Sequence, residues 1–185
     1  MILRNAEPGD LAAIAEILNI EICSGTASWT ETPKTVDNMT RWFDDRVARG
    51  YPVLVAEDGG EVLGYASYGP FRAGEGYRET VEHSVYVARP ARGRGIARLL
   101  MERLIAAARE AGLARMVGGV SADQSASMDL HRKLGFEEQG RLKGVGIKRG
   151  KRLDLALMVL ALDGAEGLRG WFGCGLRFGE RRLSG

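Results

Sequence analysis

Two glycines alternate with two arginines in a six-residue run that separates a strand-like segment from a helix-like one. The run is Arg92-Gly93-Arg94-Gly95-Ile96-Ala97. Residues 80–87, before it, are rich in β-branched side chains, which favour strands. Residues 96–111, after it, carry apolar side chains at helical spacing and are followed by Gly112, a residue type that commonly ends helices. A strand that enters a helix through a glycine turn predicts an α/β protein built on a central sheet.

A turn of this composition can bind an anion. Glycines leave backbone N–H groups unshielded, and the N-terminus of a helix carries about half a positive elementary charge together with unpaired donors. Arg92, Arg94 and Arg98 add positive charge, so a pyrophosphate is the expected ligand. A Walker A loop would need Gly-Lys-Ser/Thr, and a dinucleotide-binding fingerprint would need a third glycine where Arg98 stands, so both are excluded. From these residues alone, a solvated loop that only connects two elements is the alternative.

The rest of the chain predicts a mixed sheet of about six to seven strands flanked by about four helices. Asp10 is the expected N-cap of the first helix, and Asp58-Gly59-Gly60 is expected to form the turn of a hairpin. The stripe that the third helix is expected to bury consists of Leu99, Leu100, Leu104, Ala107, Ala108 and Ala111. Strands are expected at residues 2–5, 53–57, 62–68, 80–87, 116–120, 136–142 and 153–161, and helices after residue 10 and at residues 36–49, 96–111 and 125–134.

Length and composition exclude several classes of protein. A chain of 185 residues that is 45% hydrophobic and 27% charged is expected to fold as one globular domain. It has no uncharged apolar run near the roughly 18 residues of a membrane span, and charges occupy the place of a secretory signal, so a cytoplasmic protein is expected. Its two cysteines and two histidines match no metal-binding pattern, and a net charge of +2 makes nucleic acid an unexpected partner.

The last 22 residues differ in kind from the rest. Residues 164–185 hold seven of the 26 glycines and four arginines against two glutamates, whereas residues 1–163 carry the periodic apolar segments. We therefore expect one domain over residues 1–163 and an appended Gly/Arg-rich tail after it. The alternatives for the tail are disorder and contact with a partner through Trp171, Phe172 and Phe178.

The glycine and arginine run matches the pattern Q/R-x-x-G-x-G/A of the GNAT superfamily of acyl-CoA-dependent N-acetyltransferases, and the predicted element order resembles that fold. Residues 80–87 and 130–136 resemble the branch that acetylates phosphinothricin and methionine sulfoximine. The resemblance covers residues 2–163. It implies an acetyl-CoA-dependent N-acetyltransferase that needs no metal and forms a homodimer.

The same resemblance implies how the cofactor binds. Residues 80–87 and 116–120 would splay apart to admit it, and the pantetheine arm would pair with the strand backbone at Val85 to Val87 as an added strand does. A backbone N–H near Val85 would stabilise the developing oxyanion. The residues implied for acetyl-CoA binding are Val85, Tyr86, Val87, Arg92, Gly93, Arg94, Gly95, Ile96, Ala97, Arg98, Gln124 and Lys133.

An amine attacks a thioester only when it is neutral, so a base must take its proton. We expect Glu82 to be this base, because it precedes the cofactor-binding segment, shares a strand face with Ser84 and Tyr86, and gains basicity if burial raises its pKa. A surface carboxylate is the alternative. His131 lies where many members have a tyrosine that protonates the leaving thiolate, so it is expected to be that acid or a neutral structural histidine. His83 points to the other face and is expected to be structural.

The acceptor site is implied by resemblance to consist of Trp29, Thr30, Arg72, Ala73, Gly74, Tyr77 and Glu82. Arg72 stands out because a guanidinium pairs with a carboxylate or with sulfoximine or phosphinate oxygens. An exposed loop arginine without a ligand is the alternative. Neither cysteine has a context that would make it a nucleophile. The expected reaction is therefore direct attack, in a ternary complex, by the α-amine of methionine sulfoximine, methionine sulfone or phosphinothricin.

Two departures from the family pattern keep other functions open. Gln124 stands where the family has asparagine, and residues 149–154 replace a stretch that carries an aromatic residue followed by tryptophan. Pocket shape, substrate choice and dimer packing can differ accordingly. The alternatives are an acetyltransferase acting on a protein N-terminus or a polyamine, and a non-catalytic module that binds acyl-CoA or RNA.

Overall fold

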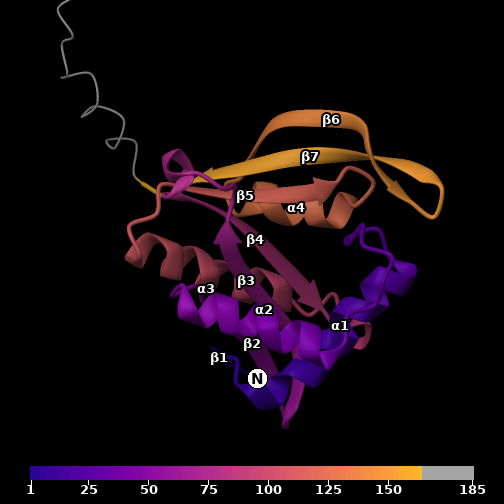
Figure 1. Ribbon diagram of the computed structural model, residues 1–185, viewed down its shortest axis with the longest axis vertical. Coiled ribbons are helices and arrows are strands. Elements are labelled where there is room, and N and C mark those ends of the chain that lie inside the picture. Colours follow the sequence, from indigo (N-terminus) through magenta and orange to yellow (C-terminus); the bar gives the residue numbers. More distant parts are fainter. Residues whose placement is uncertain (164–185) are drawn as a thin grey trace, which may run out of the picture.

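The computed structural model describes residues 1–163, which form seven strands and four α-helices (Figure 1). Their order along the chain is the predicted one, and the α/β class with a mixed sheet is confirmed. The predicted tail, residues 164–185, lies outside the described residues. The elements are β1 (Ile2–Asn5), α1 (Leu11–Ser24), α2 (Val36–Ala48), β2 (Val53–Asp58), β3 (Glu61–Pro70), β4 (Thr80–Val87), α3 (Ile96–Glu110), β5 (Arg115–Ser121), α4 (Ser125–Lys133), β6 (Glu137–Lys148) and β7 (Lys151–Ala161).

All seven strands lie in one sheet, in the order β1-β2-β3-β4-β5-β7-β6. Neighbouring strands are antiparallel except β4 and β5, which are parallel and are connected through helix α3. The β4–β5 ladder is short, because it runs only from the pair Thr80 and Arg115 to the pair Glu82 and Val117. Beyond Glu82 the two strands diverge and leave an opening in the sheet (Figure 1), as the resemblance implied.

Helices cover both faces of this sheet. One apolar cluster joins α1 and α2 to residues of β2 and β3 such as Val55 and Tyr65. A larger cluster joins α3 and the α4 residue Met128 to the opposite face. Successive side chains of a strand point to opposite faces, so neighbouring residues of β4 reach different helical layers at the opening.

Helix α3 buries a face that is rotated from the predicted one. Leu100, Leu104 and Ala108 are buried as expected, but Leu99 is 38% exposed. Ala107 is half-buried and Ala111 is exposed, whereas the helix buries Ile96, Met101 and Ile105 in their place. Spacing alone cannot tell which flank of a broad apolar stripe faces the sheet, because residues on both flanks repeat every three to four positions.

The β2–β3 hairpin is confirmed, and its turn consists of the last two of the three residues predicted for it. Asp58 pairs with Glu61, so the two turn residues are Gly59 and Gly60, at φ angles of 61° and 84°. Two-residue turns of this kind need positive φ at both positions, which glycine adopts without strain.

The last hairpin is longer than the sequence predicted. Strand β6 continues to Lys148 and β7 begins at Lys151, with Arg149 and Gly150 in the turn at φ angles of 48° and 73°. The predicted strands end at residue 142 and resume at residue 153, and the stretch between them contains three glycines. Pairing with β7 holds this segment in the sheet despite two irregularities in the register.

Asp10 precedes helix α1 as expected, but its side chain does not cap that helix. Its carboxylate instead accepts a hydrogen bond of 2.7 Å from the backbone N–H of Glu7 and two of 2.7 and 2.8 Å from the Arg4 guanidinium. Arg4 also donates from Nε to Glu57 at 2.7 Å. Asp10 is thus the N-cap residue of α1, as predicted, but it makes no side-chain cap bond, because a two-pronged ion pair with Arg4 is stronger than a hydrogen bond to one helical N–H.

Replacing Asp10 by asparagine is expected to lower the free energy of unfolding by about 1–3 kcal/mol at neutral pH, through loss of charge-assisted hydrogen bonds. The hydrogen bonds from Arg4 hold the pKa of Asp10 below its usual value of 3.8. A lowered carboxylate pKa stabilises the fold above the unfolded pKa, and that contribution is lost as the pH falls through the folded pKa. Urea denaturation should therefore find that the gap between wild type and Asp10→Asn closes below about pH 4. An equal gap at neutral and low pH would refute this account.

Candidate active site

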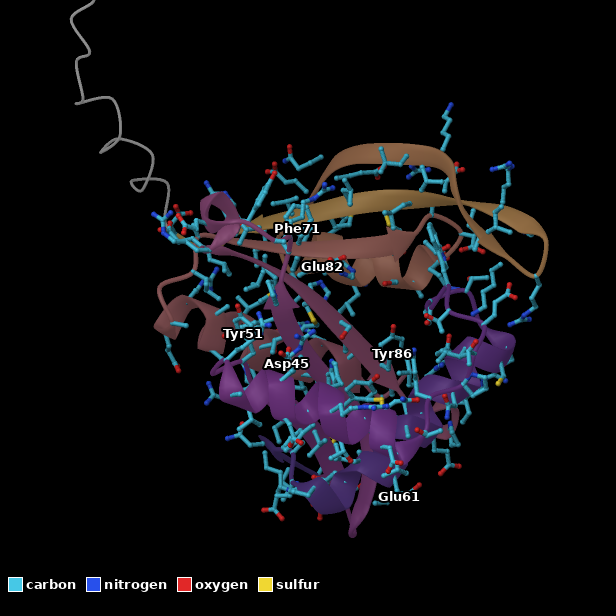
Figure 2. The ribbon with its side chains drawn as sticks, in the orientation of Figure 1. Asp45, Tyr51, Glu61, Phe71, Glu82 and Tyr86 are labelled. Atoms are coloured by element: carbon cyan, nitrogen blue, oxygen red, sulfur yellow. The ribbon has the colours of Figure 1, made fainter. Side chains whose placement is uncertain are left out.

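Two connected cavities lie at the opening between β4 and β5. The first, of about 310 Å³, contains Glu82 and His131 and is called the catalytic cavity here. The second, of about 420 Å³, runs past the glycine and arginine run and is called the cofactor groove. They share residues at their junction, among them Val85 and Gln124, so they form one continuous site. In Figure 2, Glu82 lies near the narrow end of the opening and Tyr86 near its wide end.

The backbone of β4 presents unpaired groups to this opening. Hydrogen bonds from Phe71 N–H to the Thr80 carbonyl and from Ala88 N–H to the Leu63 carbonyl mark the two ends of the β3–β4 ladder. Because antiparallel bonding alternates, even-numbered residues of β4 bond to β3 and odd-numbered ones face β5. Val85 and Val87 thus point N–H and carbonyl groups into the opening, where the β5 ladder has ended.

Tyr86 belongs to the set whose backbone faces β3, opposite Tyr65. It therefore offers the site its side chain, which lines both cavities and stacks on the Tyr65 ring at 5.4 Å between centroids. Three residues are implied to pair with the pantetheine arm. Of these, only Val85 and Val87 have backbone groups that face the opening. The Val87 carbonyl already accepts a hydrogen bond of 3.2 Å from Nε of Arg92.

The turn before α3 has the conformation that an anion cradle needs. Gly93 and Gly95 have φ angles of 76° and 80°, which non-glycine residues adopt only with strain. Gly95 is the N-cap residue of α3 and provides no side-chain cap, so the first N–H groups of the helix stay open to the groove. No atom lies within 4 Å of the position of a Cβ at either glycine, so this end of the groove is open.

The three arginines near the cradle are all held in ion pairs. Arg92 pairs with Glu21 at 2.5 Å, Arg98 with Glu102 at 2.7 Å and Arg94 with Asp58 at 3.3 Å. Arg92 and Arg98 line the groove, whereas Arg94 is turned toward the β2–β3 hairpin. The turn therefore offers an anion its open backbone amides, whereas the charges of the three arginines are already paired.

Glu82 extends from β4 across the opening toward β5. Its Oε1 lies 3.1 Å from the position that a Cβ would occupy at Gly119, so a larger residue there would crowd it. Burial raises the pKa of the Glu82 carboxyl, and the positive charge of Arg72 partly opposes this effect. The side chain remains accessible from the cavity. A raised pKa together with access is what a general base needs.

His83 and His131 form a buried pair on the face of the sheet opposite Glu82. Nδ1 of His131 lies 2.7 Å from the Ser127 carbonyl oxygen, so Nδ1 carries the proton and Nε2 has the lone pair. Nε2 of His83 lies 3.1 Å from Nε2 of His131 and must donate to it. Nδ1 of His83 is then unprotonated, and among the described residues it has no hydrogen-bond partner.

Both histidines are neutral at neutral pH. Burial, followed by the nearby His131, lowers the pKa of His83 to about 3. Burial also lowers the pKa of His131, against the opposing effect of the Ser127 carbonyl. Sequence reasoning put His83 on the face away from Glu82, but it had no signal for the pair, since 48 residues separate the two histidines.

The residues expected to bind the acceptor do not gather in one place. Arg72 and Tyr77 line a groove at the β3–β4 loop together with Ala73 and Gly74, and this groove shares Pro70 with the catalytic cavity. Thr30 lines a further cavity, which lies between helices α1 and α2 and the sheet. This cavity shares Ser84 and Tyr86 with the catalytic cavity. The following residues lie on the walls of these two acceptor-side cavities: Thr30, Lys34, Asn38, Trp42, Arg72, Ala73, Gly74 and Tyr77.

Three other predicted residues have different surroundings. The Trp29 ring packs on Gly146 of β6, where a Cβ would lie 2.2 Å from it, and it lines none of these cavities. Lys133 is exposed at the end of α4, away from the groove. Gln124 lines both the groove and the catalytic cavity, and its side chain donates to Thr26 at 2.5 Å.

Sequence reasoning missed one charged residue of the catalytic cavity. Arg46, on α2, lines the cavity together with Glu82 and Ser84. In the sequence it is one of several charged residues in an amphipathic helix, so nothing distinguished it from a solvated position. Among residues 1–163, no helix is long and apolar enough to span a bilayer, and no three His, Cys, Asp or Glu side chains are grouped as metal ligands.

A sheet opened between two parallel strands, with a strand edge and an uncapped helix N-terminus facing the gap, suits a ligand that carries both an amide-bearing arm and a phosphate, as acyl-CoA does. Comparison with known families agrees. Residues 14–136 match the model of the Acetyltransferase (GNAT) family, and the chain belongs to this family.

Three proteins that are similar to this chain show which members of the family it resembles. The L-methionine sulfoximine/L-methionine sulfone acetyltransferase of Pseudomonas aeruginosa is 49% identical over 162 residues, which cover 87% of this chain and 94% of the relative. The structure of yncA from Salmonella typhimurium with acetyl-CoA has a TM-score of 0.87 at 44% identity, covering 89% and 95% of the two chains. The structure of a ribosomal-protein-alanine N-acetyltransferase from Brucella melitensis has a TM-score of 0.86 at 46% identity, covering 87% and 99%.

The protein is therefore an acetyl-CoA-dependent N-acetyltransferase, as the resemblance predicted. The groove suits this cosubstrate, since it offers backbone groups at Val85 and Val87 for an amide-bearing arm and an open, glycine-lined helix N-terminus for a pyrophosphate.

Proposed function

We propose that this protein transfers the acetyl group of acetyl-CoA to the α-amine of a small amino-acid analogue of the methionine sulfoximine, methionine sulfone or phosphinothricin type. The observation that carries this proposal is the position of Glu82, a carboxylate with a raised pKa in a cavity beside the open backbone of Val85. The similarity to the Pseudomonas aeruginosa relative supports the acceptor class.

In this proposal acetyl-CoA supplies an acetyl group activated as a thioester, and the chain's own residues do the rest. Val85 and Val87 pair with the pantetheine arm, and the amides from Gly93 to Arg98 bind the pyrophosphate. The Val85 N–H donates to the acetyl oxygen and stabilises its developing negative charge. Glu82 takes the proton from the acceptor ammonium, directly or through a water molecule, so that the neutral amine attacks in a ternary complex.

The acceptor class is tested by the release of the CoA thiol in the presence of a panel of candidates. The panel consists of L-methionine sulfone, L-methionine sulfoximine, phosphinothricin, a peptide with an N-terminal alanine, and a polyamine. We expect the first three to give the largest kcat/KM. A higher kcat/KM for the peptide would favour a protein N-terminus as the acceptor, the second candidate, which the similarity to the Brucella melitensis structure supports.

Activity is expected to fall on the acid side, with an apparent pKa above the ordinary glutamate value of 4.5, because Glu82 must be ionised to act and burial raises its pKa. The positive charge of Arg72 lowers that pKa, so Arg72→Met should move the acid limb of the kcat profile to higher pH. Profiles of kcat for both enzymes measure this directly. A limb that stays in place or moves to lower pH in Arg72→Met would contradict the assignment of Glu82.

We also propose that His131 protonates the leaving thiolate. The neutral ring has its lone pair on Nε2, so it must first take a second proton there, and the acceptor nitrogen releases that proton as the amide forms. Nε2 then passes the proton to the sulfur, and His131 returns to its neutral form. Replacing His131 by phenylalanine should lower kcat by about tenfold to a hundredfold, with the KM for acetyl-CoA nearly unchanged. An unaltered kcat would mean that His83 and His131 only pack against each other and take no part in the reaction.

A homodimer is proposed on the basis of the outer strand β6. Leu142, Val145 and Ile147 on this edge strand are 44%, 54% and 57% exposed. Apolar side chains on an exposed edge strand favour association with another chain. Light scattering should give twice the chain mass of 20.1 kDa, and the mass of a single chain would overturn the proposal.

A further inference from the structure

The side chain of Arg46 leaves helix α2 and lies flat against strand β3. Its Cζ is 2.5 Å from the position that a Cβ would occupy at Gly69, so this strand position must be glycine for the guanidinium to fit. Gly69 is the register partner of Glu82. Partners in an antiparallel ladder point to the same face of the sheet, so Arg46 and Glu82 lie in the same layer of the catalytic cavity.

The guanidinium of Arg46 has few partners of its own. Among the described residues, its buried Nε makes no hydrogen bond. The nearest carboxylate is that of Asp45, at 3.4 Å from NH1, and the Trp42 ring centroid lies 5.8 Å from Cζ. An arginine has five N–H donors, and a partly buried cation with a single long ion pair favours a bound anion. Burial lowers the pKa of Arg46, because the nearby carboxylate does not make up for the water that the guanidinium has lost.

Arg46 and Glu82 border the cavity from two sides. Arg46 lies over Gly69 of β3, whereas the Glu82 carboxylate leans the other way, over Gly119 of β5. These two strands flank β4, so the charged groups are on the order of 10 Å apart, or two inter-strand spacings. A hydrogen bond of about 2.8 Å at each end leaves roughly 4 Å. The ammonium nitrogen and a carboxylate oxygen of an α-amino acid are three bonds apart and lie about 3–3.5 Å from each other, which is close to that gap.

We propose that Arg46 binds the α-carboxylate of the acceptor amino acid and thereby directs its α-amine to Glu82. This inference rests on the proposed function and assigns the acceptor's charged end to a residue of α2. Arg72 lies in the neighbouring loop groove, beyond Pro70, and is left to contact the polar end of the acceptor side chain. Arg46 is then the residue by which the enzyme selects amino acids over simple amines.

The test compares L-methionine sulfone with its carboxamide, in which the carboxylate is replaced by a neutral amide. Wild type should acetylate the sulfone with a much higher kcat/KM than the carboxamide. Arg46→Met should lower kcat/KM for the sulfone by at least about thirtyfold, the effect of removing one partner of a buried charge pair, and change the value for the carboxamide less than about threefold. Arg41→Met, an exposed position on the same helix, is the matched control and should leave both values unchanged.

If Arg46 only holds α2 against β3, its replacement should lower kcat/KM for the sulfone and the carboxamide equally. That result would overturn the inference. If Arg46→Met does not fold, Arg46→Lys retains the charge and should keep a reduced preference for the sulfone. Equal kcat/KM values of wild type for sulfone and carboxamide would also refute the role of Arg46, while leaving the acceptor class intact. Acetylation of neither compound by wild type would instead refute the proposed function, and the inference with it.

Discussion

Replacing Glu82 by glutamine is expected to lower kcat by about a hundredfold to ten-thousandfold, the usual contribution of a general base. Glutamine keeps the size of the side chain that lies over Gly119 but cannot take a proton. The KM for acetyl-CoA should change less than about twofold, because the groove residues that bind it are separate. Thiol release at saturating acceptor, together with calorimetric titration of CoA, measures the two effects independently.

Glu79 supplies the matched control for this variant. It lies just before β4, is exposed, and pairs only with Arg78 among the described residues, at 3.3 Å. Glu79→Gln makes the same chemical change outside the cavity and should leave kcat within about twofold of wild type. If Glu82→Gln kept the wild-type rate, another group would have to take the proton, and the proposed mechanism would be withdrawn.

Replacing Gly95 by valine is expected to raise the dissociation constant for CoA by about tenfold to a hundredfold. Gly95 has a φ angle of 80°, and valine in this region is strained. The new side chain meets no protein atom within 4 Å but enters the mouth of the groove, so it would displace the pyrophosphate from one or two backbone amides. Each hydrogen bond to a charged group contributes about 1.5–3 kcal/mol.

A control variant at the opposite end of the same helix distinguishes a loss of CoA binding from an effect of backbone strain. Gly112 follows α3 at a φ angle of 70°, and it also has no atom within 4 Å of a Cβ position. Gly112→Val should therefore lower the melting temperature about as much as Gly95→Val does, and leave CoA affinity unchanged. Equal losses of CoA affinity in both variants would mean that strain in α3, and not the cradle, weakens binding.

Much of the site could be predicted because its determinants are local. The positive φ angles at Gly93 and Gly95, the strand before them and the helix after them depend on residues close together in the chain. The face of Glu82 follows from the two-residue period of a strand. The order of helices and strands was correct for the same reason, since hydrophobic period and glycine turns act over a few residues.

Where prediction failed, residues far apart in the chain decide the outcome. Arg46 needs the absence of a side chain at Gly69, and His83 meets His131 only because β4 and α4 pack at the same opening. Trp29 packs on Gly146, in the part of β6 that lies beyond the predicted strand. The spacing of residues in the sequence cannot predict such contacts, because they form only when elements far apart in the chain become neighbours.

The sequence by itself determined the succession of elements, the glycine turn before α3 and the face of β4 on which Glu82 lies. Only the tertiary structure decided that β4 and β5 part after Glu82, that α2 contributes a cation to the resulting cavity, and that the expected acceptor residues fall into separate grooves. The physical reason is one of range. Backbone dihedral preferences and hydrophobic period act between near neighbours, whereas a cavity is formed by side chains whose positions depend on the packing of the whole sheet and its helices.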